Sequence, residues 1–272
     1  MRKQTRFLHQ AIYFFIFFFI ILLTALPGYA QTITIEGSQT TMQNLDVIYG
    51  DQGGTGERTA LVAPGAVVDV PSAGGPGVYG STAGGYWTLT NSGIVRGDQG
   101  VYLCLGGSVT NEGEITARAL NDAGVYLANG GYVNRVTNTS TGIITGGTSF
   151  SNGGFGVNIL SGAANPSVVD NSGRIFAYGN GTDTGSAVLL NGGGSVINRA
   201  GGIITGGYGG TKGSGVYIVG NGSVENSGQI TGNNYQSVLI TGIPSAAMGR
   251  QVITWKSKPS ASHRLPLCRQ AT

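Results

Sequence analysis

Two short motifs return along most of the chain, and this internal repeat constrains the fold more than any other feature of the sequence. The first motif, Gly-Val-Tyr-Leu or a variant, recurs every 21 to 32 residues and begins at Gly77, Gly100, Gly124, Gly156, Ser186, Gly215 and Gln236. The second, Asn-Ser-Gly-x-Ile-x-Gly or a variant, alternates with it and begins at Asn91, Asn111, Ser140, Asn171, Gly201 and Asn226. A unit this short cannot bury its own apolar face, so the repeats predict a stack of similar units.

Residues 215–232 show what one unit contains. Three strand-length pieces carry β-branched residues, namely Val216–Val219, Ser223–Glu225 and Gln229–Thr231. Gly and Asn, which accept a positive φ at a sharp corner, separate them. Three strands and three corners describe one coil of a right-handed, single-stranded parallel β-helix. We therefore predict an all-β solenoid of about seven coils, roughly 30–35 Å long at ~4.8 Å per coil.

A β-sandwich of short strands is the alternative fold. It needs hairpin turns between neighbouring strands and an alternation of apolar and polar residues along each. The same residue types instead return only after 20 to 32 positions. The repeat interval therefore favours the β-helix.

An asparagine recurs at what would be the same corner of successive coils. A column of such side chains can pass amide hydrogen bonds from coil to coil and satisfy groups that a tight corner would bury unpaired. The predicted corner ladder consists of Asn91, Asn111, Asn171, Asn198 and Asn226.

The two ends of the chain differ from the repeats. Arg2, Lys3 and Arg6 precede the apolar run 11–26 and a Pro-Gly-Tyr-Ala sequence, which is the pattern of a secretory signal peptide over residues 1–30. An uncleaved membrane anchor is the alternative, but it needs about 20 apolar residues. Residues 31–76 are predicted to form an N-terminal cap and the first coil, and residues 77–242 the β-helix repeats.

Residues 243–272 form an atypical basic tail. From residue 250 onward it contains no Gly, Asn, Asp or Glu, but five Lys and Arg. An abrupt change of composition within a repeat pattern indicates either a natural exposed, disordered tail or a reading-frame shift that shortened a longer repeat protein.

Charge and histidine content exclude several classes of function. Residues 31–249 hold 7 Lys and Arg against 12 Asp and Glu, a net charge of −5, so no basic surface for nucleic acid is expected. No histidine occurs between His9 and His263. A Ser-His-Asp or Cys-His catalytic group, or a histidine metal site, is therefore not expected in the body. We predict no catalytic residues, no metal site and no cofactor.

Three weaker candidates remain. Arg96-Gly97-Asp98 is a cell-attachment tripeptide placed in a predicted turn, although chance can supply it in a chain so rich in Gly. Glu112 and Glu114 could share one face of a strand, as the paired carboxylates of a glycosidase do, but two such residues near a corner are more often solvated. Cys104 is predicted to be a small buried residue, with a bridge to Cys268 as the alternative.

The leader and the two alternating motifs resemble the passenger domain of bacterial autotransporters (type V secretion) over residues 1–242. The resemblance implies export, display at the cell surface by a C-terminal translocator barrel, and a role in virulence as a non-enzymatic adhesin or self-association module. Its implied partners are host surface glycans, host receptors or further copies of itself, contacted through loops. Protease-type passengers carry Gly-Asp-Ser-Gly, whereas the nearest match, residues 97–100, has Gln in place of the nucleophile.

The chain shows no series of alternating strands that would form a translocator barrel, so we expect it to be a truncated member. It would reach the outer membrane, cell surface or extracellular space if a translocator is supplied, and otherwise the periplasm. Two alternatives stay open. One is a β-helix polysaccharide lyase or hydrolase, and the other is a non-functional remnant of a longer autotransporter.

Overall fold

The computed structural model describes residues 32–49, 58–82, 85–120, 122–128, 131–147, 154–162, 164–178, 185–208, 213–233 and 236–241, and the backbone of 253–255. The chain divides into two units, 1–31 and 32–272, and all described residues belong to the second. The predicted signal peptide and most of the basic tail therefore lie outside the described residues.

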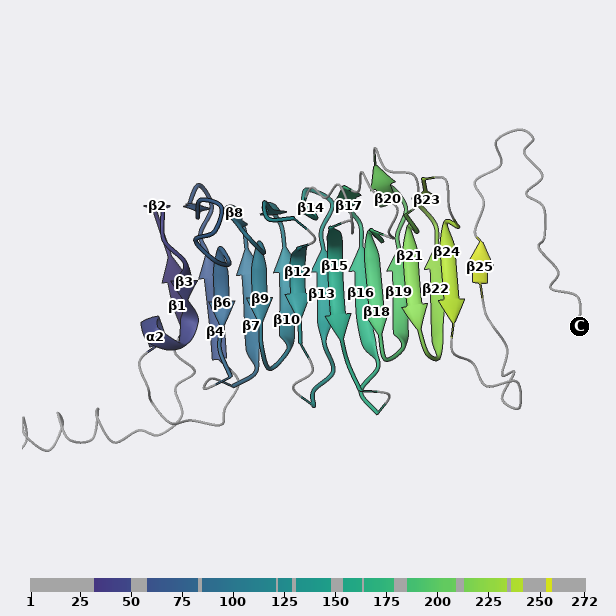
Figure 1. The fold of residues 1–272 in the computed structure, drawn as a ribbon, viewed down its shortest axis with the longest axis horizontal. Helices are drawn as coiled ribbons and strands as arrows, with labels where there is room; N and C mark the ends of the chain where they lie inside the picture. The colour runs from purple at the N-terminus through teal and green to yellow at the C-terminus, as the bar shows by residue number, and fades with distance from the viewer. Residues whose placement is uncertain are drawn as a thin grey trace, which may run out of the picture. The chain divides into compact units, whose positions relative to one another are not determined.

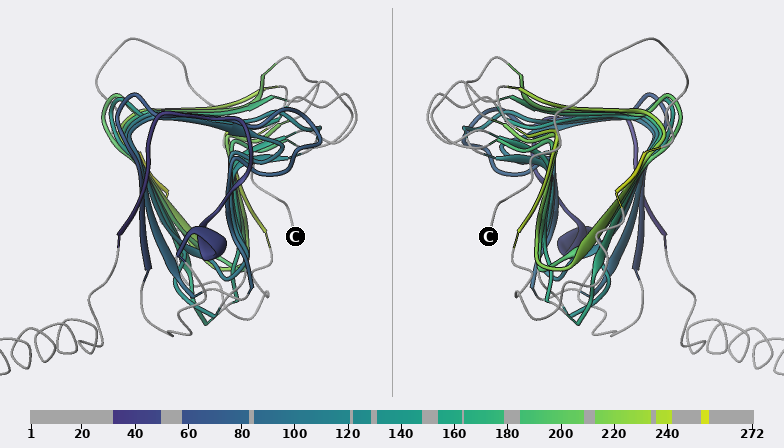
Figure 2. Two further views of the ribbon diagram at one scale, coloured as in Figure 1. Left: turned by 90° about the vertical axis from the view of Figure 1, so that its left-hand side faces the viewer. Right: turned by 90° about the vertical axis from the view of Figure 1, so that its right-hand side faces the viewer.

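The described residues form three parallel sheets that the chain visits in turn (Figures 1 and 2). Sheet A contains β1 (Thr32–Ile35), β4 (Arg58–Val62), β7 (Trp87–Asn91), β10 (Gly107–Asn111), β13 (Arg135–Asn138), β16 (Ser167–Asn171), β19 (Gly194–Asn198), β22 (Gly222–Asn226) and β25 (Ile253–Trp255). Sheet B contains β2 (Ser38–Gln39), β5 (Val67–Asp69), β8 (Ile94–Gly97), β11 (Glu114–Ala117), β14 (Ile143–Thr145), β17 (Arg174–Tyr178), β20 (Ile203–Tyr208) and β23 (Gln229–Gly232). Sheet C contains β3 (Gln43–Asn44), β6 (Val78–Gly80), β9 (Val101–Leu103), β12 (Ala123–Leu127), β15 (Phe155–Leu160), β18 (Val188–Asn191), β21 (Val216–Val219) and β24 (Val238–Thr241).

This arrangement confirms the predicted parallel β-helix. Each strand pairs in parallel with the equivalent strand of the next coil, as when β7 pairs with β10 and β8 with β11. A β-sandwich of antiparallel neighbours is excluded for these residues. The described strands make up eight complete coils, one more than the number of Gly-Val-Tyr motifs in the sequence. The additional coil is the first, because its sheet C strand β3 is Gln43-Asn44 and lacks the Gly-Val-Tyr motif.

The core is an aliphatic stack inside the three sheets. Because side chains alternate across a strand, every second residue points inward, and the parallel register places equivalent residues above one another. In sheet B, for example, Val95, Ile115, Ile144, Ile175 and Ile204 are fully buried. Burying one such side chain contributes about 1.5–3 kcal/mol relative to leaving it exposed. The stack therefore supplies most of the driving force for folding.

The A–B corner, where the chain passes from sheet A to sheet B, brings successive coils into close backbone contact. A Cβ added to Gly113 would lie 2.0 Å from the carbonyl oxygen of Gly93 in the preceding coil. Neither glycine has a positive φ. The expectation that this glycine supplies a left-handed conformation is therefore wrong, and what requires it is the approach of the neighbouring backbone.

A short helix closes the N-terminal end of the described stack. Helix α2 (Leu45–Tyr49) buries Leu45 completely against the first coils. The carboxylate of Asp46 accepts hydrogen bonds from Arg58 and from the indole nitrogen of Trp87, at 3.1 and 3.3 Å. The Arg58 guanidinium also lies 4.9 Å from the ring centre of Tyr49. A buried arginine with both an acidic and an aromatic partner thus holds the cap to the second and third coils.

The basic tail contributes one described strand. Strand β25 pairs in parallel with β22, and its three residues stand opposite Val224, Glu225 and Asn226. The other residues of 243–272 lie outside the described residues.

Candidate functional site

A column of asparagine side chains follows the A–B corner through six coils. Each amide nitrogen donates to the amide oxygen of the next asparagine at 2.8–2.9 Å, in the order Asn91, Asn111, Asn138, Asn171, Asn198 and Asn226. Each nitrogen except the last also reaches a backbone carbonyl of its own corner and one of the next coil; for Asn138 these belong to Gly142 and Arg174. The column therefore satisfies corner carbonyls that would otherwise be buried unpaired.

The structure joins all five predicted corner asparagines in this column and adds a sixth, Asn138. The predicted ladder does not include it, although Asn138 precedes its corner glycine Gly142 by four positions, the same spacing as between the predicted Asn198 and Gly202. The spacing from the preceding core residue would have found it. Every member of the column stands two residues after a buried Val or Leu, as Asn138 does after Val136.

A second buried asparagine, Asn134, braces the C–A corner, where the chain passes from sheet C to sheet A. It is fully buried, and its side-chain oxygen accepts the backbone N–H of Gly107 at 2.9 Å. Its nitrogen donates to the carbonyls of Ala128 and Leu160, each at 3.3 Å. It belongs to neither motif, so the repeat pattern gives no signal for it.

The Arg-Gly-Asp tripeptide is held in the fold by internal contacts. Arg96 and Gly97 end strand β8, so the expectation that the tripeptide lies in a turn is wrong for these two residues. The Asp98 carboxylate accepts backbone N–H groups of Ala73 and Gly75, at 2.9 and 3.0 Å. A receptor that binds the tripeptide as an exposed loop would have to break these hydrogen bonds.

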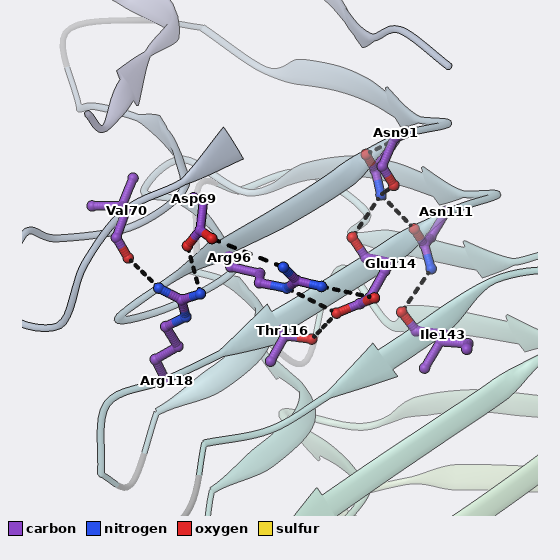
Figure 3. Close-up of polar contacts among 10 residues, drawn as sticks. Asp69, Val70, Asn91, Arg96, Asn111, Glu114, Thr116, Arg118 and Ile143 are labelled. Carbon is purple, nitrogen blue, oxygen red and sulfur yellow. Dashed lines mark hydrogen bonds and ion pairs between the residues drawn. The ribbon is translucent and has the colours of Figure 1, made fainter. Parts of the chain in front are cut away.

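The arginine of the tripeptide belongs to an ion-pair network on the outer face of sheet B (Figure 3). Arg96 lies 3.1 Å from a carboxylate oxygen of Glu114 in the next coil and 3.9 Å from Asp69 in the preceding one. Arg118 also pairs with Asp69 and donates to the carbonyl of Val70. These side chains are about one-third exposed, so each pair contributes roughly 0.2–1 kcal/mol. The network joins three coils by electrostatic attraction.

The two glutamates considered as a catalytic pair have separate partners. Glu112 accepts the hydroxyl of Ser92 at 2.8 Å, while Glu114 is engaged by Arg96. Each carboxylate therefore has its own hydrogen-bond partner, and the two do not share one. Within the described residues, no three His, Cys, Asp or Glu side chains come together as a metal site would require.

The outer face of sheet C carries a group of tyrosines beside a free thiol. The rings of Tyr79 and Tyr102 pack edge to face at 5.5 Å, and those of Tyr102 and Tyr126 at 4.9 Å. The Cys104 thiol and the Tyr79 hydroxyl share a hydrogen bond at 3.4 Å. This hydrogen bond and burial raise the pKa of Tyr79, and burial raises the pKa of Tyr102 and Tyr126. The phenols therefore stay neutral at physiological pH.

Cys104 itself follows strand β9 and is half-buried, so the prediction that it is a buried core residue is wrong. It lies one position beyond the last inward-facing residue of that strand, Leu103. Cys268, its alternative disulfide partner, lies outside the described residues.

The three corners differ in how much their length varies. Two or four residues connect sheet A to sheet B in every coil, between three and nine connect sheet B to sheet C, and between two and thirteen connect sheet C to the sheet A strand of the next coil. The shortest B–C corners are 40–42 and 98–100, and the longest are 146–154 and 179–187. Viewed along the stack, the described parts of the B–C connections extend beyond the three sheets, while the A–B corners nearly superpose (Figure 2). The A–B edge is therefore nearly constant in length, and variable loops lie along the B–C and C–A edges.

The fold and its corners define the class of this protein as a single-stranded parallel β-helix solenoid with fixed A–B corners and variable B–C loops. Comparison of the chain with models of protein families, with curated proteins and with solved structures gives no significant match. A search of the described residues found no helix with the length and apolar character needed to cross a membrane.

Proposed function

We propose that this protein is an exported, non-enzymatic display scaffold. In this role it acts as an autotransporter-like passenger whose loops contact surface glycans, receptors or further copies of the chain. The observation that carries the proposal is the contrast between its corners. The asparagine column fixes the A–B corners, while the B–C corners vary from three residues to nine at one edge of the same rigid stack. Insertions between the repeats of a solenoid often form its binding edge, and the B–C edge carries two nine-residue loops.

The composition of the longest loops agrees with contacts to polar partners. Residues 146–154 read Gly-Gly-Thr-Ser-Phe-Ser-Asn-Gly-Gly, and 179–187 read Gly-Asn-Gly-Thr-Asp-Thr-Gly-Ser-Ala. Hydroxyl and amide side chains both donate and accept hydrogen bonds, as sugar hydroxyls require. The leader and the autotransporter-like motifs support export. An exported chain carries these loops outside the cytoplasm, where they can contact glycans and receptors.

The lyase or hydrolase alternative has no observation in its favour. Glu112 and Glu114 are engaged by Ser92 and Arg96, and they form no shared acid-base pair. Release of reducing ends from a polysaccharide by the purified protein, abolished in Glu114→Gln, would reverse this conclusion.

The experiment is a loop exchange with a matched control. Deleting residues 148–153 shortens the nine-residue corner to the length of the 98–100 corner. The control deletes 162–165, which shortens a six-residue C–A corner to the length of 192–193. The chain is expressed with its leader, and the exported protein is tested on a glycan array and on cultured cells.

We expect the B–C deletion to lower binding at least tenfold while the C–A deletion leaves it within about twofold, both variants keeping the circular dichroism of the parent. Equal losses in the two variants, or a parent chain that binds neither glycans nor cells, would refute the proposal.

A further inference from the structure

The outer face of sheet C differs from the other two faces in its lack of charge. From β6 to β24 its strands contain no Asp, Glu, Lys or Arg. The outer face of sheet A carries Arg135, Asp170 and Glu225, and that of sheet B carries the ion-pair network described above. Depletion of charge together with enrichment in tyrosine is the composition of the buried centre of a protein–protein interface.

The parallel register arranges this face as one continuous row. Its outward, half-buried residues from β6 to β24, called here the sheet C column, are Tyr79, Tyr102, Tyr126, Asn158, Leu189, Tyr217 and Leu239. Asn44 of β3 continues the same register, but its side-chain oxygen accepts a backbone N–H of helix α2 and belongs to the cap. The strands that carry them lie side by side in Figure 1 and nearly superpose along the stack in Figure 2. The column can therefore meet a flat partner along its whole length.

The chemistry of the column favours a protein over a sugar as its occupant. The first three tyrosine rings pack edge to face with one another, with interplanar angles of 61° and 76°. Neighbouring rings thus pack edge to face against one another. The column therefore offers no row of parallel ring faces on which sugar rings could stack. Apolar and aromatic side chains of another β-sheet can fill the gaps between these rings.

The column is also complementary to itself. Asn158 is the fourth of its seven members, so a two-fold axis through Asn158 and parallel to the strands pairs the column with its own reverse. This operation places Tyr79 opposite Leu239, Tyr102 opposite Tyr217, and Tyr126 opposite Leu189 of the second copy. Aromatic rings meet aliphatic or aromatic side chains throughout, and no charge is buried.

An unpaired polar atom lies at the centre of this arrangement. Within the part of the chain that the structure describes, the side-chain oxygen of Asn158 is buried and receives no hydrogen bond. Leaving a buried acceptor unpaired costs about 1–3 kcal/mol. The two-fold axis brings Asn158 of the second copy to the same point, where two amides can turn and bond to each other.

We propose that the outer face of sheet C is a self-association surface, on which a second copy packs with its stack axis reversed about Asn158. This inference rests on the proposed display function, and it names the partner and the face for self-association. Seven strands at ~4.8 Å and about four residues per strand give roughly 400 Å² per copy. That is about half of a standard stable interface, so the contact is weak and acts between copies crowded on a surface.

The first experiment tests the symmetry. The protein is exported and purified as Asn158→Cys in a Cys104→Ser, Cys268→Ser background and treated with a short bis-maleimide, which spans the roughly 10 Å between packed sheets. We expect a covalent dimer whose yield rises with protein concentration. The matched control is Thr137→Cys on sheet A of the same coil, which should stay monomeric. Equal yields from the two variants would overturn the proposal.

The second experiment tests the face without crosslinking. Tyr102→Lys places a charge at the second position of the column, and sedimentation velocity measures the association constant. We expect at least a tenfold decrease, because an unpaired ammonium would have to be desolvated. Thr90→Lys, on sheet A of the same coil, should change the constant less than twofold. A parent chain that stays monomeric at millimolar concentration, or equal effects of the two lysines, would contradict the inference.

These outcomes separate the inference from the proposed display function. Loop-dependent binding to glycans or cells together with a monomeric parent chain would remove the self-association surface and leave the display function standing. Loss of cell binding in the loop deletion does not depend on the sheet C column.

Discussion

Replacing Asn138 by alanine removes a middle member of the asparagine column and tests how much the column contributes to stability. The Asn138 side chain is 1% exposed. Its nitrogen donates to Asn171, Gly142 and Arg174 at 2.8, 3.1 and 3.2 Å, and its oxygen accepts from Asn111 at 2.9 Å. The substitution therefore deletes four hydrogen bonds at a site that water does not reach.

The magnitude follows from those partners. A typical internal hydrogen bond contributes about 1 kcal/mol net, and a buried group left unpaired costs about 1–3 kcal/mol. Some partners keep other hydrogen bonds after the substitution. The Asn111 nitrogen, for example, still donates to the carbonyl of Gly113. We therefore expect Asn138→Ala to lower the free energy of unfolding by about 3–5 kcal/mol, a large part of the roughly 5–15 kcal/mol of an ordinary domain.

Asn226 provides the matched control at the end of the column. Its oxygen accepts from Asn198 at 2.8 Å and from the N–H of Gly228 at 3.1 Å, and it is 8% exposed. We expect Asn226→Ala to cost only about 1–2 kcal/mol, since fewer partners are lost. Asn138→Asp should cost more than Asn138→Ala at pH 7, because a buried carboxylate would face carbonyl oxygens to which it cannot donate.

Urea denaturation followed by circular dichroism measures these differences, with the m-value checked for each variant because solenoids can unfold in parts. If Asn138→Ala falls within 0.5 kcal/mol of the parent chain, a threshold at about the error of such measurements, the column does not stabilise the corner as argued. A cost for Asn226→Ala equal to that of Asn138→Ala would refute the dependence on position.

Three further substitutions test other contacts. Gly113→Ala should destabilise the protein by about 2 kcal/mol or more in urea denaturation, because its Cβ would meet the backbone of Gly93 at 2.0 Å. Burial raises the pKa of Asp122, so the folded chain binds a proton more readily than the unfolded chain and stability falls as pH rises through the folded pKa. Asp122→Asn, which can keep the hydrogen bond from Gln99, should therefore be at least as stable as the parent at pH 7 and lose that advantage in acid, as thermal unfolding across pH will show. Arg58→Met should lower the free energy of unfolding by about 3–5 kcal/mol, because it leaves the acidic residue of α2 without its cation; equal stability would show that the cap does not depend on this ion pair.

The tripeptide shows why a short motif fails to define a site. In sequence, Arg96-Gly97-Asp98 is adjacent to Asn-Ser-Gly and rich in turn formers, and this suggested an exposed turn. The β8–β11 pairing instead puts Arg96 beside Glu114, and the coil below supplies Ala73 and Gly75 to Asp98. These partners are 18 to 25 residues away in the chain, so no local pattern can reveal them.

The cap illustrates the same limit. Residues 31–76 lack the motifs, and Leu45–Tyr49 has no periodicity long enough to predict a helix. Asp46, Arg58 and Trp87 come together because successive coils stack, and only that stacking makes a buried arginine tolerable beside an acid and two aromatic rings.

The sequence by itself determined the repeat, the strand faces and the corner asparagines. A solenoid uses the same local geometry in every coil, so the same residue types recur along the chain at the repeat interval. Residues such as Val109, Ile115 and Val125 were readable as core for this reason. Only the tertiary structure decided which side chains meet between coils, as for the partners of the tripeptide and the uncharged column of sheet C. Contacts of that kind depend on register between residues 18 or more positions apart, and register is fixed by the packing of the whole stack.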